Sequence, residues 1–343
     1  MRRIHVLLSF LALVVCLFAT SALLPYEPPR SATSGGTLVI RPGEGASSVG
    51  RRLANSGVLA PWQRPAFAVL ARTTGLKRKL RPGLFQLPSV VSAWSLVRML
   101  ENVTPRSLRV TLPEGRTCED FSGILARNWI GDSASLSSLC HDSSFAASLG
   151  IPSTSLEGYL FPDTYLFEGG ETARDVWSIL HRRHKEVLAE IADSNSACWK
   201  RYGEHGTITL ASIVEREAAV RKEAPRIAGV FWLRLREQIP LGADPTVRYA
   251  LRKFTGTLSK TDLSLPSPYN TRFNAGLPPG PIANPGRDAI LASMRPDTTG
   301  GWLYFVAKDD GSREHFFGRT LNEHVRFKRA AERNRQTSGV MTP

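Results

Sequence analysis

One carboxylate in residues 212–226 is a candidate general acid. Glu215 lies on an otherwise small and apolar helix face, with Ala211, Ser212, Ala218 and Ala219 as its neighbours at helical spacing. An acid surrounded by small residues can lie against a ligand. Partial burial would raise its pKa toward the range that a general acid needs near neutral pH. Spacing alone also fits an ordinary surface glutamate, so Glu215 needs support from other motifs.

The second acid of this segment has a different interpretation. Glu217 is two residues from Glu215, and residues two apart point to nearly opposite sides of a helix. Glu215 and Glu217 therefore cannot both face the same site. Arg216 and Arg221 flank Glu217, and Arg221 is four residues ahead, which predicts a surface ion pair.

Aromatic residues gather in residues 156–167 around a Pro162-Asp163 turn. Tyr159 and its aromatic neighbours offer flat faces to the apolar side of a sugar, while Glu157 and Asp163 could bond its hydroxyls. The alternative is a strand–turn–strand whose aromatic side chains fill the core, and composition alone favours that alternative.

Two further segments carry groups suited to a saccharide. Asp244 precedes Pro245, which predicts an extended residue, and Thr246 is expected to cap the helix that follows. This turn would present a carboxylate and a hydroxyl to a ligand, although an ordinary helix start is the default interpretation.

The second of these segments, residues 267–286, is rich in proline and glycine and too long for a simple connector. It contains the neutral hydrogen-bonding side chains of Tyr269, Asn270, Thr271 and Asn274. A solvated connector is the alternative.

Several kinds of chemistry lack their motifs in this sequence. We find no phosphate-binding loop, no dinucleotide fingerprint, no nucleophile elbow and no His-Glu-x-x-His zinc motif. The cysteines and histidines have no metal-ligand spacing. We therefore expect no metal and no cofactor.

The charge of the chain bears on its partners. The 343 residues carry 44 Lys and Arg against 30 Asp and Glu, a net charge of +14. Such an excess suits an anionic polysaccharide, an anionic lipid or nucleic acid, or simply a solvated basic surface. No nucleic-acid-binding motif accompanies it, so nucleic acid is not an expected partner.

The N-terminus predicts export. Residues 4–24 are long and apolar enough to span a membrane, and Arg2 and Arg3 before them predict a cytoplasmic N-terminus. The alternative is a signal peptide cleaved near residues 19–22. Outside the cytoplasm Cys118 and Cys140 could form a disulfide, or these two and Cys198 could be free thiols.

The elements that must position these groups indicate an α+β protein. After an anchor (1–24) and a Pro/Ser/Gly linker (25–36), the pattern predicts strands over 37–40 and 80–87 that enclose helices over 46–57 and 65–74. A helix over 92–101 with Ser92 as N-cap completes a small module, residues 37–106. Residues 107–328 form a larger mixed domain with helices over 118–126, 142–147, 175–191, 207–221 and 225–237, and with a strand over 301–308. A basic helix over 321–335 runs into a polar tail, residues 329–343.

Five motifs in this order resemble the endolytic murein transglycosylase family, the YceG-like proteins. They are Leu-Glu-Gly-Tyr-Leu-Phe-Pro-Asp-Thr-Tyr from Leu156, Ala-Ser-Ile-Val-Glu-Arg-Glu from Ala211, Ala-Gly-Val-Phe-Trp-Leu-Arg-Leu from Ala228, Asp-Pro-Thr-Val from Asp244, and Tyr-Asn-Thr from Tyr269 followed by Gly-Leu-Pro-Pro-Gly-Pro-Ile from Gly276.

The resemblance implies a single-pass inner-membrane lyase with a LysM-like module and an extracytoplasmic catalytic domain. The family's catalytic glutamate falls on Glu215. The implied reaction cuts the bond between N-acetylmuramic acid and N-acetylglucosamine in nascent peptidoglycan and leaves 1,6-anhydro ends. The family also implies work beside peptidoglycan synthases. Two alternatives stay open: a muramidase that uses Asp244 or Glu157 as a second carboxylate, and a non-catalytic glycan-binding scaffold.

Overall fold

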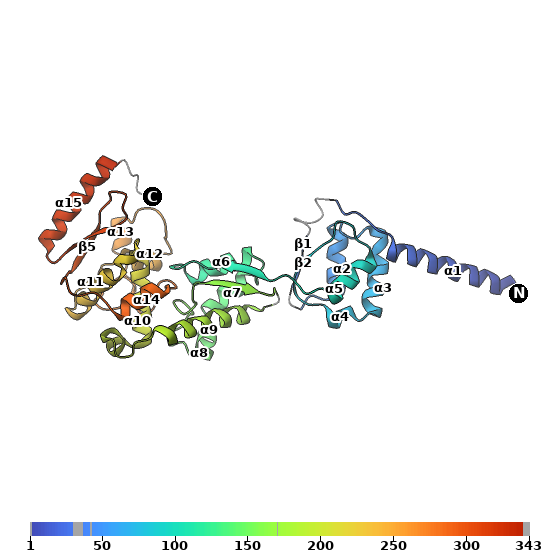
Figure 1. The fold of residues 1–343 in the computed structure, drawn as a ribbon, viewed down its shortest axis with the longest axis horizontal. Coiled ribbons are helices and arrows are strands. Elements are labelled where there is room, and N and C mark those ends of the chain that lie inside the picture. Colours follow the sequence, from blue (N-terminus) through green and yellow to red (C-terminus); the bar gives the residue numbers. More distant parts are fainter. Residues whose placement is uncertain (1, 30–36, 42, 170, 339–343) are drawn as a thin grey trace. The chain divides into compact units, whose positions relative to one another are not determined.

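The computed structural model describes residues 2–29, 37–41, 43–169 and 171–338. These residues are mostly helical, with three small two-stranded sheets among them (Figure 1). The predicted α+β class is confirmed. The chain divides into two compact units. The first comprises Met1–Val110, Leu125–Gly131 and Tyr165–Thr172, and the second comprises Thr111–Ile124, Asp132–Thr164 and Ala173–Pro343.

The first unit begins with the apolar helix α1 (Arg2–Leu23). Within the described residues it is the one helix long and apolar enough to cross a membrane, as an anchor or a signal sequence would be. The segment 25–36, which the sequence predicts as a linker, is bonded to the module at its start, because Tyr26 exchanges two backbone hydrogen bonds with Val91. Residues 30–36 lie outside the described residues.

The rest of the first unit is built on one strand pair. β1 (Thr37–Ile40) pairs antiparallel with β2 (Gly83–Gln86), and Figure 1 shows the two side by side. The helical segments of this unit are α2 (Ala46–Asn55), η2 (Pro61–Gln63), α3 (Arg64–Thr73), α4 (Leu76–Lys79) and α5 (Ala93–Asn102). The predicted strand–helix–helix–strand order is therefore present. Ser92 caps α5 as predicted, since its hydroxyl accepts a 3.0 Å hydrogen bond from the Ser95 N–H.

The second unit is dominated by helices, and its strands are short. The remaining elements of the chain are β3 (Leu108–Thr111), α6 (Cys118–Arg127), α7 (Ser133–Cys140), α8 (Ser143–Ser148), β4 (Thr164–Phe167), α9 (Ala173–Ile191), α10 (Ala197–Glu217), η3 (Arg221–Glu223), α11 (Ala224–Arg236), α12 (Asp244–Leu251), α13 (Lys260–Leu263), α14 (Arg287–Met294), β5 (Tyr304–Ala307), β6 (His315–Gly318) and α15 (Leu321–Ser338). Most of β3 and β4 and the end of α6 belong to the first unit, and the others belong to the second. β3 pairs with β4 and β5 pairs with β6. Of these, α7, η3, α13, α14 and β6 were not predicted.

Helix α10 is central to the second unit and packs against α11 and α14. Leu210, Ile213 and Val214 follow helical spacing and are all fully buried. The helix begins at Ala197 and ends at Glu217, so the predicted span of 207–221 is wrong at both ends. Gly203, with φ of 66°, breaks the helical backbone inside it.

The structure pairs two of the cysteines that the sequence left open. Cys118 and Cys140 form a disulfide with their Cα atoms 6.3 Å apart. It joins the start of α6 to the end of α7. Cys198 is a buried free thiol.

Candidate active site

Glu215 occupies the last turn of α10 and is half-buried. Its Oε2 accepts a 3.0 Å hydrogen bond from the backbone N–H of Gly286. The small neighbours expected from the sequence are only partly present. Ala211 and Ser212 are fully buried beside it, but Ala218 and Ala219 follow the end of the helix. The carboxyl group is thus held by the end of the Pro/Gly-rich segment as well as by its own helix.

Three residues of α10 fasten this Pro/Gly-rich segment along the helix. His205 Nε2 lies 2.9 Å from the Pro279 carbonyl oxygen, and the Ser212 hydroxyl accepts a 3.0 Å bond from the Ile282 N–H. The bond between Glu215 and Gly286 is the third attachment. The helix that carries Glu215 and the 267–286 segment are therefore in direct contact.

A carboxylate that the sequence analysis did not identify lies against the same glycine. A Cβ atom added to Gly286 would collide with the carboxylate of Glu114, so this close approach requires glycine. Arg221 Nη2 lies 2.6 Å from Glu114, and Arg221 Nη1 lies 3.5 Å from Asp288. The predicted ion pair of Arg221 with Glu217 is therefore wrong, because α10 ends before Arg221.

The surroundings of Glu215 favour its protonated form. Burial raises the pKa of the Glu215 carboxyl, and the nearby charges of Glu114 and Asp288 raise it further. The Gly286 hydrogen bond and the positive charge of Arg221 act in the opposite direction, but burial prevails. A glutamic acid with a raised pKa can donate a proton near neutral pH.

Asn284 joins this site to Glu157. Its Oδ1 accepts hydrogen bonds from the backbone N–H groups of Gly158 and Leu160, at 2.9 and 3.1 Å. Its Nδ2 donates to the Arg116 carbonyl at 3.0 Å and to Glu157 Oε1 at 3.2 Å. A single buried amide therefore fixes the 156–167 motif against the 114–117 segment and the end of the Pro/Gly-rich segment.

Glu157 lies at the base of a cavity of about 390 Å³. Burial raises the pKa of its carboxyl to about 8, although it accepts bonds from the Cys118 N–H at 3.1 and 3.3 Å. Tyr249 and Tyr269 also line the cavity, and their ring centroids are 5.2 Å apart. Aromatic side chains and a carboxyl group in one cavity wall suit a sugar ring.

The cavity and Glu215 share one stretch of backbone. Thr117 lines the cavity, whereas Gly115 lies against the Glu215 side chain. Two residues span at most about 7 Å of chain, so the two places lie close together.

The other predicted ligand-binding residues are mostly internal. Tyr159 is fully buried, and its hydroxyl lies 2.7 Å from His205 Nδ1. His205 Nε2–H donates to a carbonyl, so Nδ1 accepts and the Tyr159 hydroxyl donates. Tyr159 thereby positions the Pro/Gly-rich segment through His205. The core-filling interpretation holds for this side chain, which no ligand can reach in the structure.

Asn270, Thr271 and Thr246 hold the 267–286 segment against α13 and α12. Asn270 is buried and donates to the carbonyls of Leu263, at the end of α13, and of Leu265. Thr271 and Thr246 are also buried, and their hydroxyl oxygens are 2.9 Å apart. The expected cap by Thr246 is absent. The N-cap of α12 is Ala243, whose carbonyl accepts the Thr246 hydroxyl at 2.7 Å.

Asp244 and Glu217 line a second cleft, of about 560 Å³. Asp244 is the first helical residue of α12 rather than an extended one, and it forms an ion pair with Arg272. Burial raises the pKa of Glu217 to about 7. Arg234 and Arg272 line the same cleft and lower that pKa in part. Glu217 is therefore a cleft residue and not the surface ion-pair partner that the sequence predicted.

Comparison with known proteins gives a consistent family. The model of the YceG-like family matches residues 38–330. An endolytic murein transglycosylase of Bacillus subtilis is 41% identical over 174 residues, which is 50% of this chain and 47% of that protein. One from Streptococcus pneumoniae is 33% identical over 190 residues, 50% of this chain and 33% of its own length. The chain therefore spans half or less of these curated relatives.

A solved structure extends the likeness over more of the chain. The crystal structure of a yceG-like protein from Listeria monocytogenes has 27% identity and a TM-score of 0.58. The match covers 84% of this chain and 98% of that one. Among the residues that our structure describes, no group of three or more His, Cys, Asp or Glu side chains could hold a metal ion.

Proposed function

Because the chain belongs to the YceG-like family, we propose that it is an endolytic lytic transglycosylase of peptidoglycan, a lyase of cell-wall biogenesis and degradation. Its substrate is the β-1,4 bond between N-acetylmuramic acid and N-acetylglucosamine inside nascent glycan strands. The position of Glu215 carries the proposal. This half-buried carboxyl with a raised pKa is bonded to Gly286 at the end of the Pro/Gly-rich segment.

In the proposed mechanism Glu215 acts first as acid and then as base. Protonated Glu215 donates to the leaving oxygen of N-acetylglucosamine as the glycosidic bond breaks. The resulting carboxylate then removes the proton of the muramic acid 6-hydroxyl, whose oxygen bonds to C1. The product is a 1,6-anhydro end. No water is consumed, and the proton returns to Glu215.

The cavity beside Glu157 supports a role in holding neighbouring sugars. Tyr269 and Tyr249 offer ring faces there, and Glu157 offers a carboxyl group that its raised pKa keeps largely protonated at neutral pH. Thr246, Asn270 and Thr271 act indirectly, because they fix the loop that carries Tyr269. Asp244 contributes to the second cleft and not to this cavity.

We place the second unit outside the cytoplasm, with α1 as a single-pass anchor in the inner membrane and a cytoplasmic N-terminus. The apolar length of α1 supports the span. The strand–helix–helix–strand order supports a LysM-like role in glycan binding for residues 37–106. Cutting nascent glycan strands would end their elongation. This supports a position of the enzyme beside peptidoglycan synthases.

A muramidase is the second candidate, and Glu114 is the observation that favours it. Both carboxylates lie against Gly286, and glycosidases that hydrolyse commonly use two such groups. Asp244 and Glu157 suit that role less well. Asp244 is paired with Arg272, and Glu157 is enclosed by Cys118 and Asn284.

Product analysis decides between these reactions. The full chain in neutral detergent would be incubated with uncrosslinked glycan, and the products would be analysed by mass spectrometry. We expect 1,6-anhydro ends from the wild type and also, more slowly, from Glu114→Gln. Reducing ends would establish the muramidase and reject the transglycosylase. Glu157→Gln should keep the anhydro product, because the glutamate is largely neutral at pH 7.

A further inference from the structure

The end of α1 is built into the module that follows it. Ala22 is 4% exposed and belongs to the core of the first unit. The Ser21 hydroxyl donates to the Trp62 carbonyl, and Gln63 Nε2 donates to the Leu24 carbonyl at 2.9 Å. Together with the hydrogen bonds between Tyr26 and Val91, these contacts hold the residues that directly follow α1 against the module. Cleavage near residues 19–22 would remove part of this core.

Because of these contacts, the module lies directly at the end of α1, the helix that we propose to span the membrane. η2, α3 and α5 all contact α1. Trp62 of η2 and Trp94 of α5 are 41% and 42% exposed. Exposed tryptophans beside the end of a spanning helix are typical of the lipid headgroup layer. The module therefore lies at the headgroups.

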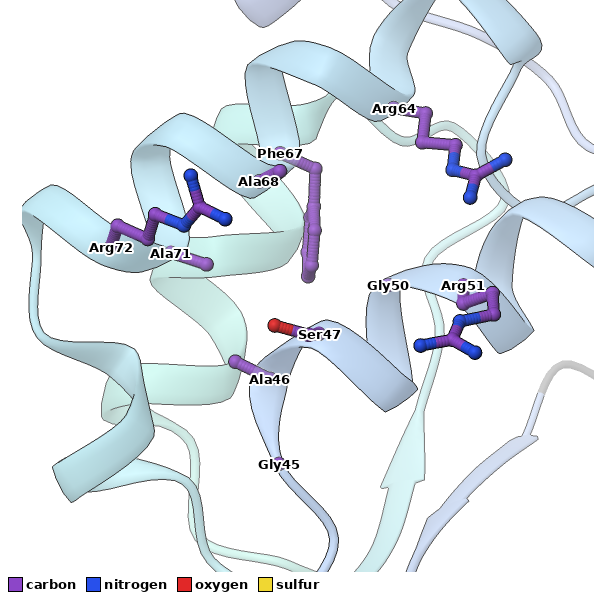
Figure 2. A pocket seen from close by; sticks show the side chains of 10 residues that line it. All are labelled: Gly45, Ala46, Ser47, Gly50, Arg51, Arg64, Phe67, Ala68, Ala71 and Arg72. Atoms are coloured by element: carbon purple, nitrogen blue, oxygen red, sulfur yellow. The ribbon is translucent and has the colours of Figure 1, made fainter.

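A cavity of about 500 Å³ opens between α2 and α3 of this module (Figure 2). Its floor is formed where the Phe67 ring lies on Gly50, a contact that leaves no room for a Cβ atom. Arg51, Arg64 and Arg72 surround it, and no acidic side chain lines it.

The positive charges of the three arginines are not neutralised by neighbouring carboxylates that the structure describes. None of them forms an ion pair with a carboxylate among the described residues, whereas the neighbouring Arg52 is paired with Glu44 at 2.8 Å. A guanidinium group binds phosphate through a fork of N–H donors. The cavity is thus suited to an anion, and its charge is not already neutralised by the protein.

The cavity also begins where α1 ends. Arg64 is the first residue of α3 and directly follows Gln63, which is bonded to the end of α1. Arg72 is about 12 Å further along α3, at 1.5 Å per residue. Attraction to an anionic bilayer persists over roughly that distance.

We propose that the cavity between α2 and α3 binds the phosphate of an anionic phospholipid at the outer face of the membrane. The proposal rests on the proposed span of α1 but not on the cleavage reaction. A glycan fits the cavity less well. Phe67 is only 2% exposed and Ser47 provides the one side-chain hydroxyl in the lining, so little is available for sugar rings.

Lipid retention by the full chain tests this proposal. The protein in dodecyl maltoside would be titrated with dioleoylphosphatidylglycerol and examined by native mass spectrometry. We expect one tightly retained lipid. The variant Arg51→Gln/Arg64→Gln/Arg72→Gln should need roughly tenfold or more lipid for the same occupancy. Ala68→Glu, an exposed substitution in the lining, should act in the same direction without removing an arginine.

A matched variant controls for total charge. Arg41→Gln/Arg78→Gln/Arg81→Gln removes three exposed arginines of the same module that do not line the cavity. It should retain the lipid within about twofold of the wild type. Equal loss in both triple variants would reject a specific site. So would displacement of the lipid by equimolar inorganic phosphate, or stronger binding of chitopentaose than of lipid. Lipid retention by a chain that cuts no glycan would reject the proposed reaction alone.

Discussion

Two carboxylates two residues apart on the last turn of α10 have opposite surroundings. Glu215 lies beside the acids Glu114 and Asp288 and accepts a backbone hydrogen bond from Gly286. Glu217 lines a cleft with Arg234 and Arg272, and no described residue forms a hydrogen bond or ion pair with its carboxylate. Each is half-buried, and burial is the main reason that each pKa is raised.

This comparison teaches that a raised pKa does not by itself identify a catalytic acid. By that measure Glu217 qualifies, since its pKa is about 7. What distinguishes Glu215 is its position, bonded to the end of the Pro/Gly-rich segment at Gly286 and lying against Gly115, which is two residues from Thr117 in the wall of the Glu157 cavity. Geometry has to select the acid before its protonation can explain the chemistry.

The largest expected difference between Glu215 and Glu217 is in catalysis. Glu215→Gln removes the transferable proton and should slow glycan cleavage by a factor of roughly 100 or more, because a general acid–base group contributes about that much. Glu217→Gln should stay within about tenfold of the wild type. Rates of anhydro-product formation at pH 7 measure both. If Glu217→Gln were the slower variant, the roles that we assign to Glu215 and Glu217 would be reversed.

Gly286→Ala should reduce cleavage roughly tenfold. The added methyl group displaces the Glu114 carboxylate, whose charge helps to keep Glu215 protonated. Glu114 can move because it is a flexible side chain, so the melting temperature should change little. Gly280→Ala is the matched control in the same segment, since its Cβ would make only ordinary contacts of 3.5 and 3.6 Å. An equal loss of activity in both variants would contradict a specific role for Gly286.

The sequence predicted what depends on local pattern. The strand of 37–40 is observed as β1, and Ser92 caps α5, because alternation and capping are set by near neighbours. Glu215 is half-buried, and burial raises its pKa, as its helical neighbours predicted. Part of the reasoning was wrong, since Ala218 and Ala219 are not helical.

The contacts that complete the site could not be predicted in this way. Glu114 and Gly286 are far apart in the sequence, and the Asn284 side chain joins its own segment to two others. Periodicity carries no information about such distant partners. Glu114 shortly precedes the predicted helix over 118–126, but only tertiary contact shows that its carboxylate lies beside Glu215.

The variant Glu114→Gln tests whether Glu215 is the titrating acid, through the pH dependence of cleavage. The negative charge of Glu114 raises the pKa of Glu215, and its removal also releases Arg221, which lowers that pKa. Both effects act in the same direction. A general acid works only when protonated, so the loss of activity at high pH should begin at a lower pH in the variant. A pH–rate profile of the full chain measures this shift. An unchanged profile would mean that Glu215 is not the titrating acid.

The smallest expected effect is on the stability of the protein, and it comes from Glu217. The folded pKa of Glu217 is about 7 and its ordinary value is 4.5, so the folded state prefers the protonated form. Wild-type stability should therefore fall as the pH rises from about 4.5 through 7, because the folded protein must then hold this charge away from water. Glu217→Gln removes that dependence, so its melting temperature should match the wild type near pH 5 and exceed it near pH 8. Glu190→Gln, on the exposed side of α9, controls for the substitution itself. If Glu217→Gln were less stable than the wild type at pH 8, the ionised carboxylate would be a stabilising partner of Arg234 and Arg272, and the contrast between the two faces would be one of function alone.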